Sequence, residues 1–441
     1  MKNKLMKIIL QIFLTITGIA CIPTLIVNAA DSMERTYQPA GLCNLGNTCY
    51  MNATLQALLN DKELVGYTLT APESDINKVN RLGSGGRVFA AFKALCQQYV
   101  SSNGIAVKPD EFKRIFGNFY ALFDDYNQHD ASECLISVLD ALHEDLNQSD
   151  VAKGFMTRKH ANDTLGGMPL HYACNKSPIV DIYHGVQHTD FTCPDCHHTS
   201  SKDEALINWD LNISSTSTTN LNDCIDLYSR SEILAPGEEW NCENCGRLVR
   251  ATKTVSIKKL ASRITIQLKR FSQTPTGGLV KNPAPVIYPV EFDASKYAVN
   301  AGSYELNSII CHFGTLNGGH YISYVKNNGQ WFRCDDSSVT LVSEKEALSQ
   351  TSAAYVLLYS KKPIDFQTTD IPLNTTTPLA TDVPPAKPFL ITQPVVVKPV
   401  STVQQRPVAK PSFSLSSGIP DEETLEVFRV YNPNNGMHHY T

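Results

Sequence analysis

The chain has 441 residues, of which 42% are hydrophobic and 18% are charged, and its formal net charge is −5. This length suits two or three domains, or one large domain with appended segments. The apolar fraction excludes a wholly disordered chain. The net charge is mildly negative, whereas nucleic-acid-binding proteins typically carry an excess of basic residues. The 13 cysteines are an odd number, so at least one thiol lies outside any intramolecular disulfide.

The first thirty residues differ from the rest of the chain. Three lysines precede an uncharged stretch, residues 8–30, which ends in the small residues Ala29 and Ala30. A basic start, an apolar middle and a small-residue end predict a secretory signal peptide over residues 1–30. The alternative is a membrane anchor through residues 8–30, because the stretch is long enough to span a bilayer. We therefore expect a secreted or cell-surface protein.

Composition divides the remainder into three parts. Residues 38–361 carry aromatic residues and cysteines throughout, which predicts the globular domain. Residues 362–420 are rich in proline and threonine and contain no cysteine, which predicts an extended linker. Residues 421–441 regain aromatic residues around Asn-Pro and Asn-Gly pairs that favour tight turns. This last segment resembles the start of a repeat module on Gram-positive surface proteins, truncated here.

The strongest functional signal lies in the segment GLCNLGNTCYMN, residues 41–52. Thr48 is a preferred N-cap residue, and apolar residues recur at helical spacing over residues 49–60. Cys49 is therefore predicted on the first turn of a helix, where the helix dipole and free N–H groups favour the nucleophilic thiolate. From spacing alone, a buried and inert cysteine is the alternative.

A cysteine nucleophile needs a histidine within hydrogen-bond reach and a third group that orients the imidazole. His320 follows Asn-Gly-Gly and begins an alternating apolar run. A short turn leads to a second run that ends in Asp335 and Asp336. In such a hairpin, His320 and the acid pair would lie near the same end. A surface histidine beside a solvated acid pair is the alternative.

Two further patterns lie between these segments. Residues 127–146 carry an apolar stripe at helical spacing, which predicts an amphipathic helix with Asp130 and Glu133 three residues apart. Two Cys-x-x-Cys pairs, Cys193 with Cys196 and Cys242 with Cys245, offer four thiolates for a tetrahedral structural Zn²⁺. Their separation predicts that they lie at the tips of two hairpins. A redox role for either pair is the alternative.

Through these segments, residues 39–361 resemble the ubiquitin-specific protease family of deubiquitinases. The resemblance implies an α+β fold, with a papain-like thumb and palm and a zinc-bearing antiparallel β fingers region at about residues 185–270. It implies a cysteine-type isopeptidase that cleaves after the C-terminal glycine of ubiquitin or a related modifier. A non-catalytic ubiquitin-binding module on a cell-surface stalk is the alternative function.

The resemblance also implies a role for each matching residue. Cys49 takes the position of the nucleophile, Asn44 that of the oxyanion-stabilising residue, His320 that of the general base, Asp335 that of the orienting acid and Asp336 that of a second nearby acid. Asp130 and Glu133 stand where the family binds arginines of the ubiquitin tail. His129 and Ser132 depart from the Gln and His usual beside them.

The partners expected from this resemblance are ubiquitin or ubiquitin-like conjugates, bound by a monomer whose only membrane contact is the N-terminal segment. Many cysteines remain outside the nucleophile and the zinc pairs, which is unusual for an exported protein in oxidising surroundings. We therefore expect an exported bacterial protein that acts in a reducing environment. The sequon Asn52-Ala53-Thr54 within the nucleophile segment agrees, because a glycan there would obstruct the site. Bacteria mostly lack ubiquitin, so the expected substrates are host proteins.

Overall fold

The computed structural model describes residues 37–363, except residues 166, 214–216, 274–278, 300 and 316–317. These residues belong to the first of two compact units, residues 1–367. The predicted signal segment and the predicted C-terminal module lie outside the described residues, as does the predicted linker from residue 364 onward. No helix within the described part of the chain is long and apolar enough to cross a membrane.

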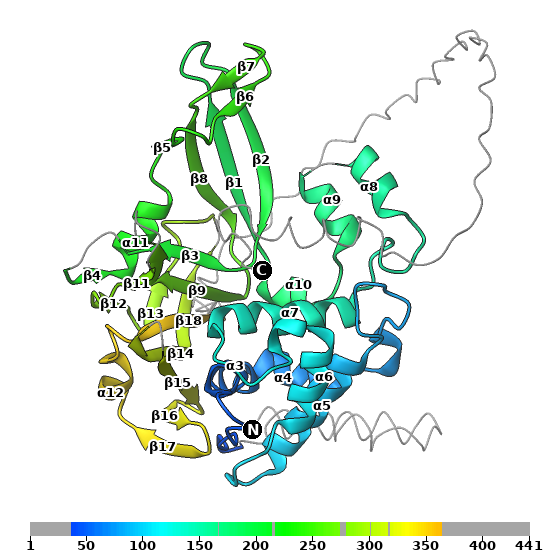
Figure 1. Cartoon of the computed structure of the whole chain (residues 1–441), viewed down its shortest axis with the longest axis vertical. Coiled ribbons are helices and arrows are strands. Elements are labelled where there is room, and N and C mark those ends of the chain that lie inside the picture. The colour runs from blue at the N-terminus through cyan, green and yellow to red at the C-terminus, as the bar shows by residue number, and fades with distance from the viewer. Residues whose placement is uncertain are drawn as a thin grey trace, which may run out of the picture. The chain divides into compact units, whose positions relative to one another are not determined.

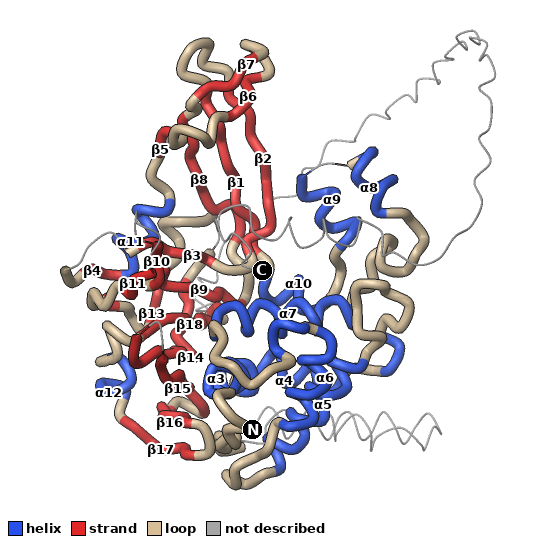
Figure 2. Tube along the Cα trace, in the orientation of Figure 1, coloured by secondary structure: helices blue, strands red, loops and turns tan. Residues whose placement is uncertain are grey.

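The first half of the domain is helical (Figure 1; blue in Figure 2). Polar caps fix several helix starts: Asp61 accepts hydrogen bonds from the backbone N–H groups of Glu63 and Leu64. Apolar residues on one face of each helix pack against the neighbouring helices. The helices are α3 (Cys49–Leu59), α4 (Lys62–Thr70), η1 (Glu73–Asp75), α5 (Arg87–Ser101), α6 (Asp110–Phe119), η2 (Ala121–Phe123), α7 (Ala131–Leu146), α8 (Arg158–Thr164), α9 (Gly167–Cys174) and α10 (Pro178–Tyr183).

The second half is dominated by an eight-stranded sheet of order β17-β16-β15-β14-β18-β9-β3, with β13 paired to β14. Strand β3 runs parallel to β9, whereas the pairs from β9 to β17 are antiparallel. The strands are β3 (Trp209–Asn212), β9 (Arg263–Lys269), β13 (Glu291–Asp293), β14 (Ser303–Thr315), β15 (Gly318–Asn327), β16 (Gln330–Asp335), β17 (Ser338–Val342) and β18 (Ala354–Lys361).

A second sheet of order β2-β1-β8-β5 lies within the predicted fingers region. Figure 1 shows β1, β2 and β8 extending away from the large sheet toward the β6–β7 hairpin. The predicted range of 185–270 is too wide in one respect. Strands β3 and β9 belong to the large sheet, because Trp209, Ile264 and Ile266 pack in its core. The strands are β1 (Gly185–Thr192), β2 (Thr199–Leu206), β5 (Glu232–Ile233), β6 (Trp240–Cys242), β7 (Arg247–Val249) and β8 (Thr252–Lys259).

Short elements connect these parts. They are β4 (Thr219–Asn220), α11 (Leu221–Tyr228), β10 (Phe271–Gln273), β11 (Leu279–Lys281), β12 (Val286–Ile287) and α12 (Glu344–Leu348). Strands β10 and β11 form a hairpin, and β12 pairs with β4 in parallel.

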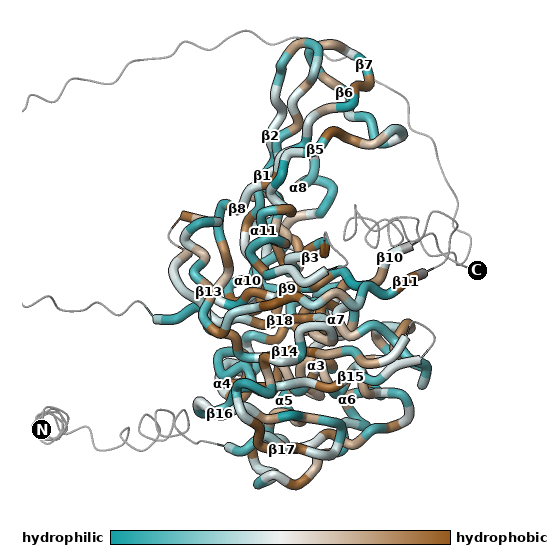
Figure 3. Tube along the Cα trace, turned by 90° about the vertical axis from the view of Figure 1, so that its left-hand side faces the viewer, coloured by the Kyte–Doolittle hydropathy of each residue, from teal (hydrophilic) through white to brown (hydrophobic). Residues whose placement is uncertain are grey.

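Helix α3 joins the helical half to the large sheet. Every residue of α3 is buried, and the helix packs against β14, β15 and β16 as well as α7. Hydrophobic positions, brown in Figure 3, are frequent around β9 and β18, and six consecutive residues of β18 are buried. The packing of α3 on β15 brings together two segments that are far apart in the chain. The observed architecture confirms the predicted α+β fold.

Candidate active site and metal centre

Cys49 is the first residue of α3, as predicted, and its side chain is buried. Thr48 stands at the N-cap position, but its hydroxyl makes no cap hydrogen bond. It accepts instead from the backbone N–H of Leu45 at 2.9 Å, while Asn44 Oδ1 accepts from the N–H of Gly46 at 2.9 Å. Thr48 thus occupies the predicted N-cap position, but the tight loop before the helix uses its hydroxyl.

The surroundings of Cys49 raise the pKa of its thiol. Burial is the main cause, and the negative charge of Asp336 adds to it. A hydrogen bond from the backbone of Tyr321 acts in the opposite direction. The backbone N–H groups of Cys49 and Tyr50 at the helix start lower the pKa of the thiol, as predicted, but burial outweighs them. The contact with Tyr321 places the thiol beside the residue that follows His320.

His320 and Asp335 form a hydrogen-bonded pair, with His320 Nε2 2.7 Å from Asp335 Oδ1. They lie on β15 and β16, whose two-residue turn has Asn328 and Gly329 in the left-handed region at φ 49° and 77°. The hairpin thus brings both residues to the same end, as predicted. Because Nε2 is held by the carboxylate, Nδ1 of His320 is the nitrogen left for a thiol.

Arg333 supports this pair from within β16. Its Nη2 donates to Asp335 Oδ2 at 2.6 Å. Burial alone would raise the pKa of Asp335, but the hydrogen bond with His320 and the charge of Arg333 together lower the pKa of that carboxyl. Asp335 is therefore a stable anion beside the imidazole. Sequence reasoning missed Arg333, although its place two residues before Asp335 puts it on the same strand face.

The carboxylate of Asp336 is hydrogen-bonded to the cysteine loop, and it also lies within 4.8 Å of a ring nitrogen of His320. Its Oδ2 accepts from Asn44 Nδ2 at 2.9 Å, and its Oδ1 accepts from Asn52 Nδ2 at 2.7 Å. Its backbone carbonyl accepts from the N–H of Leu42 at 2.8 Å. Asp336 thus ties the end of β16 to the loop before α3 and to the helix itself. Asn52 was missed as a site residue, and its place one turn after Cys49 is the signal that could have found it.

Gln128 connects the segment before α7 to the turn before His320. Its Oε1 accepts from the backbone N–H of Gly319 at 3.2 Å, and its Nε2 donates to the carbonyl of Gly319 at 3.3 Å. Beneath this turn lies His312, since a Cβ on Gly319 would come within 2.1 Å of His312 Nε2. Sequence reasoning missed both residues, because only the tertiary fold brings them to position 319.

Asp130 and Glu133 lie at the start of α7, but they differ in availability. Asp130 is the N-cap: its Oδ1 accepts from the N–H groups of Ser132 and Glu133 at 2.8 and 3.0 Å. Its Oδ2 accepts from the hydroxyl of Tyr355 at 2.6 Å. The Glu133 side chain is exposed. The predicted helix therefore begins at Ala131, and both oxygens of Asp130 already have partners.

The four cysteines of the two pairs converge. Cys193 and Cys196 lie between β1 and β2, whereas Cys242 and Cys245 lie at the β6–β7 hairpin. Sγ of Cys193 is 3.9 Å from Sγ of Cys245, and Sγ of Cys196 is 3.6 Å from Sγ of Cys242. All four sulfurs lie within 4.8 Å of one another. The prediction that two hairpins carry the pairs is confirmed.

Each cysteine pair lies in its own turn, and the two turns have the same geometry. The backbone N–H of His197 donates to the carbonyl of Cys193 at 3.1 Å, and that of Gly246 donates to the carbonyl of Cys242 at 2.8 Å. His197 and Gly246 both adopt left-handed backbone, with φ of 58° and 63°. The turn thus holds each cysteine pair in a similar geometry, and His197 occupies a conformation that favours glycine.

The ubiquitin carboxyl-terminal hydrolase family matches residues 40–359, most of the chain and nearly all of the described part. The chain belongs to this family. The match spans the loop of Cys49, the four cysteines and the hairpin of His320 and Asp335.

Curated relatives in the ubiquitin carboxyl-terminal hydrolase family agree. "Probable ubiquitin carboxyl-terminal hydrolase 4" of Schizosaccharomyces pombe is 33% identical over 363 residues, covering 77% of this chain and 61% of that protein. "Ubiquitin carboxyl-terminal hydrolase 2" of Bos taurus is 32% identical over 337 residues, covering 73% of this chain and 54% of that protein. This chain therefore spans little more than half of these relatives' length. Both relatives are eukaryotic, so they give no support to a bacterial origin.

Solved structures of ubiquitin hydrolases show the same fold. The "SAGA Ubp8/Sgf11/Sus1/Sgf73 DUB module bound to ubiquitin aldehyde" has a TM-score of 0.57 at 23% identity, covering 74% of this chain and 70% of that one. A SAGA DUB module bound to monoubiquitin has a TM-score of 0.58 at 22% identity, covering 77% and 74%. At this identity the likeness supports the fold of the hydrolase domain alone.

Proposed function

We propose that this family member is a thiol-dependent isopeptidase that hydrolyses the bond after the C-terminal glycine of ubiquitin or a ubiquitin-like modifier. The observation that carries the proposal is the pairing of His320 with Asp335 at 2.7 Å, next to the backbone contact between Tyr321 and Cys49. A buried thiol, an oriented imidazole and a carboxylate in this order are the parts of a cysteine-protease triad.

The proposed reaction has two steps. His320 takes the proton of the Cys49 thiol as Sγ attacks the carbonyl carbon of the terminal glycine. The C–N bond to the lysine amine then breaks as His320 passes this proton to the amine. His320 then takes a proton from water, which attacks the thioester and releases the modifier's carboxylate and the Cys49 thiol. Asp335 acts as a positioning residue that fixes the imidazole and stabilises its charged form.

Asn44 is the proposed donor to the oxyanion that forms in the first step. An amide N–H directed at the developing charge is worth about 10²–10³ in rate. One Nδ2 proton of Asn44 is donated to Asp336, and the second is left for the oxyanion. Asp336 accordingly serves as a positioning residue for Asn44 and Asn52, a different role from that of Asp335.

The ubiquitin tail is proposed to pass the start of α7. Asp130 and Glu133 place two carboxylates there, which suits arginine side chains of a bound tail. Because Asp130 caps the helix and accepts from Tyr355, the exposed Glu133 is the better candidate for a direct ion pair. Glu133→Gln should weaken binding of ubiquitin, whereas exposed Glu111→Gln on α6 should leave the affinity unchanged.

We propose a structural Zn²⁺ at Cys193, Cys196, Cys242 and Cys245. Four sulfurs at about 2.3 Å from a tetrahedral zinc lie about 3.8 Å from one another, which agrees with the observed 3.9 and 3.6 Å. Zinc there would join the tips of two hairpins. Purified protein should contain one zinc per chain, and Cys242→Ser should lose zinc and stability, because structural zinc binding is coupled to folding. Zinc-free protein with unchanged stability would contradict the proposal.

Export, source and assembly are proposals that rest on the sequence. The basic start and the Ala29-Ala30 end of residues 1–30 support cleavage after Ala29 or Ala30, with an anchor through residues 8–30 as the alternative. N-terminal sequencing of protein secreted from bacterial expression cells would distinguish the two.

The proposed substrates are ubiquitin conjugates of a host organism, in a reducing environment. The proposed assembly is a monomer, which light scattering would test.

A ubiquitin probe with a C-terminal electrophile tests the activity most directly. Wild-type protein should form a covalent adduct through Cys49, and Cys49→Ala should form none while still binding ubiquitin. Cys43→Ala is the matched control, because Cys43 lies in the same loop and is partly exposed. Binding without adduct or turnover in the wild type would favour the non-catalytic binding module.

A further inference from the structure

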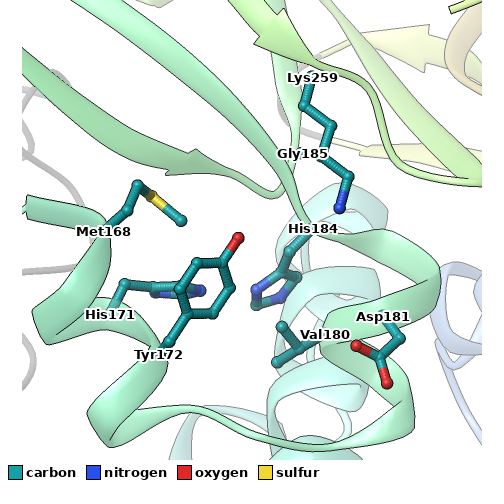
Figure 4. Close-up of a pocket in the computed structure, with 8 residues that line it drawn as sticks. All are labelled: Met168, His171, Tyr172, Val180, Asp181, His184, Gly185 and Lys259. Atoms are coloured by element: carbon teal, nitrogen blue, oxygen red, sulfur yellow. The ribbon is translucent and has the colours of Figure 1, made fainter. Parts of the chain in front are cut away.

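A cavity of about 270 Å³ lies where α9 and α10 meet the start of β1. Figure 4 shows two imidazoles, those of His171 and His184, turned toward each other across it. Their ring centroids are 5.6 Å apart. Neither residue belongs to the triad or to the cysteine cluster. The cavity is also lined by Met168, Tyr172, Val180, Asp181, Gly185 and Lys259.

Each imidazole presents a buried nitrogen that is unsatisfied. Nε2 of His171 and Nδ1 of His184 are buried and have no hydrogen-bond partner among the described residues. A buried polar atom without a partner is costly, and native proteins satisfy nearly all of them. Two such atoms lining one cavity indicate that something inside the cavity bonds to them.

A chain of hydrogen bonds determines which kind of atom His171 needs. Asn175 Nδ2 donates to the backbone carbonyl of His171 at 2.9 Å, which fixes the orientation of the amide. The same Nδ2 lies 3.2 Å from His171 Nδ1, so Nδ1 is the acceptor. The proton of the neutral imidazole is therefore on Nε2, which points into the cavity as a donor. Asn175 Oδ1 is in turn engaged by His143 Nε2 at 3.1 Å.

This arrangement selects against a metal ion and for a hydrogen-bond acceptor. A metal at His171 Nε2 would need the lone pair there and a proton on Nδ1, which would then face the Asn175 N–H group. Burial lowers the pKa of His171 to about 4 and that of His184 to about 3, so both rings are neutral donors near pH 7. An acceptor at His184 would select the tautomer that carries its proton on Nδ1.

The cavity lining carries one positive charge, on Lys259, and one negative charge, on Asp181. The side chain of Lys259 is exposed and forms no ion pair with the described residues. In Figure 4 the Lys259 ammonium points toward His184. Two neutral N–H donors and one ammonium are a donor set for an oxyanion.

We propose that this cavity is a binding site for a small oxyanion, the carboxylate or phosphate group of a compact ligand. His171 Nε2 and His184 Nδ1 donate to its oxygens, and Lys259 neutralises its charge. The cavity is slightly smaller than typical small-molecule pockets of about 300–1,000 Å³. It therefore suits a ligand of a few heavy atoms beyond the anionic group, with Met168 and Val180 against its apolar part.

The test measures thermal unfolding of the full chain in chloride buffer with added inorganic phosphate or acetate, at constant ionic strength. A ligand that binds only the folded state raises Tm in a saturable way, here by about 2 °C or more at high occupancy. A response to phosphate alone, or to acetate alone, identifies which oxyanion the site prefers. Absence of a saturable shift with both probes would overturn the proposal and leave water as the occupant.

Variants locate the effect in the cavity. His171→Phe keeps the ring and removes the donor, and Lys259→Met removes the charge from an exposed side chain without touching the core. Both should lose most of the shift in Tm. The matched controls are His160→Phe on α8 and Lys345→Met on α12, two exposed positions outside the cavity, which should keep it. Equal shifts in all four variants would place the anion elsewhere and refute the assignment.

Discussion

Asp335 and Asp336 are adjacent in the chain, yet their carboxylates contact different parts of the active site. Asp335 accepts from His320 at 2.7 Å, whereas Asp336 accepts from Asn44 at 2.9 Å and from Asn52 at 2.7 Å. Strand β16 ends at Asp335, and Asp336 adopts left-handed backbone at φ 50°. This change of backbone direction turns the second carboxylate toward the cysteine loop. One acid therefore orients the base, and the other positions the loop.

We predict that His320→Ala and Asp335→Asn reduce turnover of a ubiquitin C-terminal amide by different amounts. His320→Ala removes both the thiol's partner and the proton donor for the leaving amine, so activity should nearly vanish. Asp335→Asn removes only the group that orients the imidazole, so a loss of about 10²–10⁴ with measurable residual turnover is expected. Near-normal turnover in His320→Ala would remove the triad assignment. Near-normal turnover in Asp335→Asn would show that Asp335 is not the orienting acid.

Asp336→Asn should also change the pH dependence of the rate. Burial raises the pKa of Cys49, and the charge of Asp336 raises it further. Removing this charge should lower the pKa of Cys49, so the thiolate forms at lower pH. The acidic limb of kcat/KM should then move to lower pH. The maximum should fall, because the amide keeps only one acceptor oxygen for the two donors Asn44 and Asn52. Glu346→Gln on the exposed side of α12 should leave the limb in place, and an unshifted limb in Asp336→Asn would contradict the prediction.

The sequence was informative about the triad because local patterns encode it. The alternating runs around Asn328-Gly329 predict a hairpin, and a hairpin of that register must bring His320 close to Asp335. Helix α7 was predicted on its apolar stripe and ends at Leu146, as expected. The start of that helix was placed too early, because Asp130 acts as its cap.

Features that depend on tertiary packing could not be predicted. The raised pKa of Cys49 results from burial of α3 against β15, which no local pattern reports. The contact of Gln128 with Gly319 joins residues 191 positions apart. The cavity of His171 and His184 arises where α9, α10 and β1 converge, and the two histidines are unremarkable in the sequence.

Acid should destabilise the protein through these buried histidines. The pKa values of His171 and His184 in the folded state are about 4 and about 3, below the ordinary value of about 6.5. The unfolded chain therefore binds more protons in this range, so stability is complete above about pH 6.5 and falls as pH drops toward 4. Each histidine contributes at most about 1.4 kcal/mol per pH unit.

Urea unfolding between pH 7.5 and pH 4.5 measures this contribution. His184→Phe should flatten the decline of the unfolding free energy relative to wild type, because the ring no longer titrates. His160→Phe is the control, because it removes an exposed imidazole that does not line the cavity. Parallel pH curves for wild type and His184→Phe would show that His184 is not buried as a neutral ring.

Gly41, in the cysteine loop, packs tightly against the segment after Asp335. A Cβ at Gly41 would lie 2.1 Å from the carbonyl oxygen of Ser337. Gly41→Ala must therefore push Ser337 away and strain the neighbouring hydrogen bond from Leu42 to Asp336. We expect a stability loss of about 1–3 kcal/mol, as for other overpacked sites, and a fall in kcat exceeding any change in KM. Gly66→Ala is the matched control: nothing lies within 4 Å of its added Cβ, and alanine in α4 should leave activity unchanged and raise stability by up to about 1 kcal/mol. If Gly41→Ala and Gly66→Ala had the same unfolding free energy and the same turnover, the close contact at Gly41 would not be needed for stability or activity.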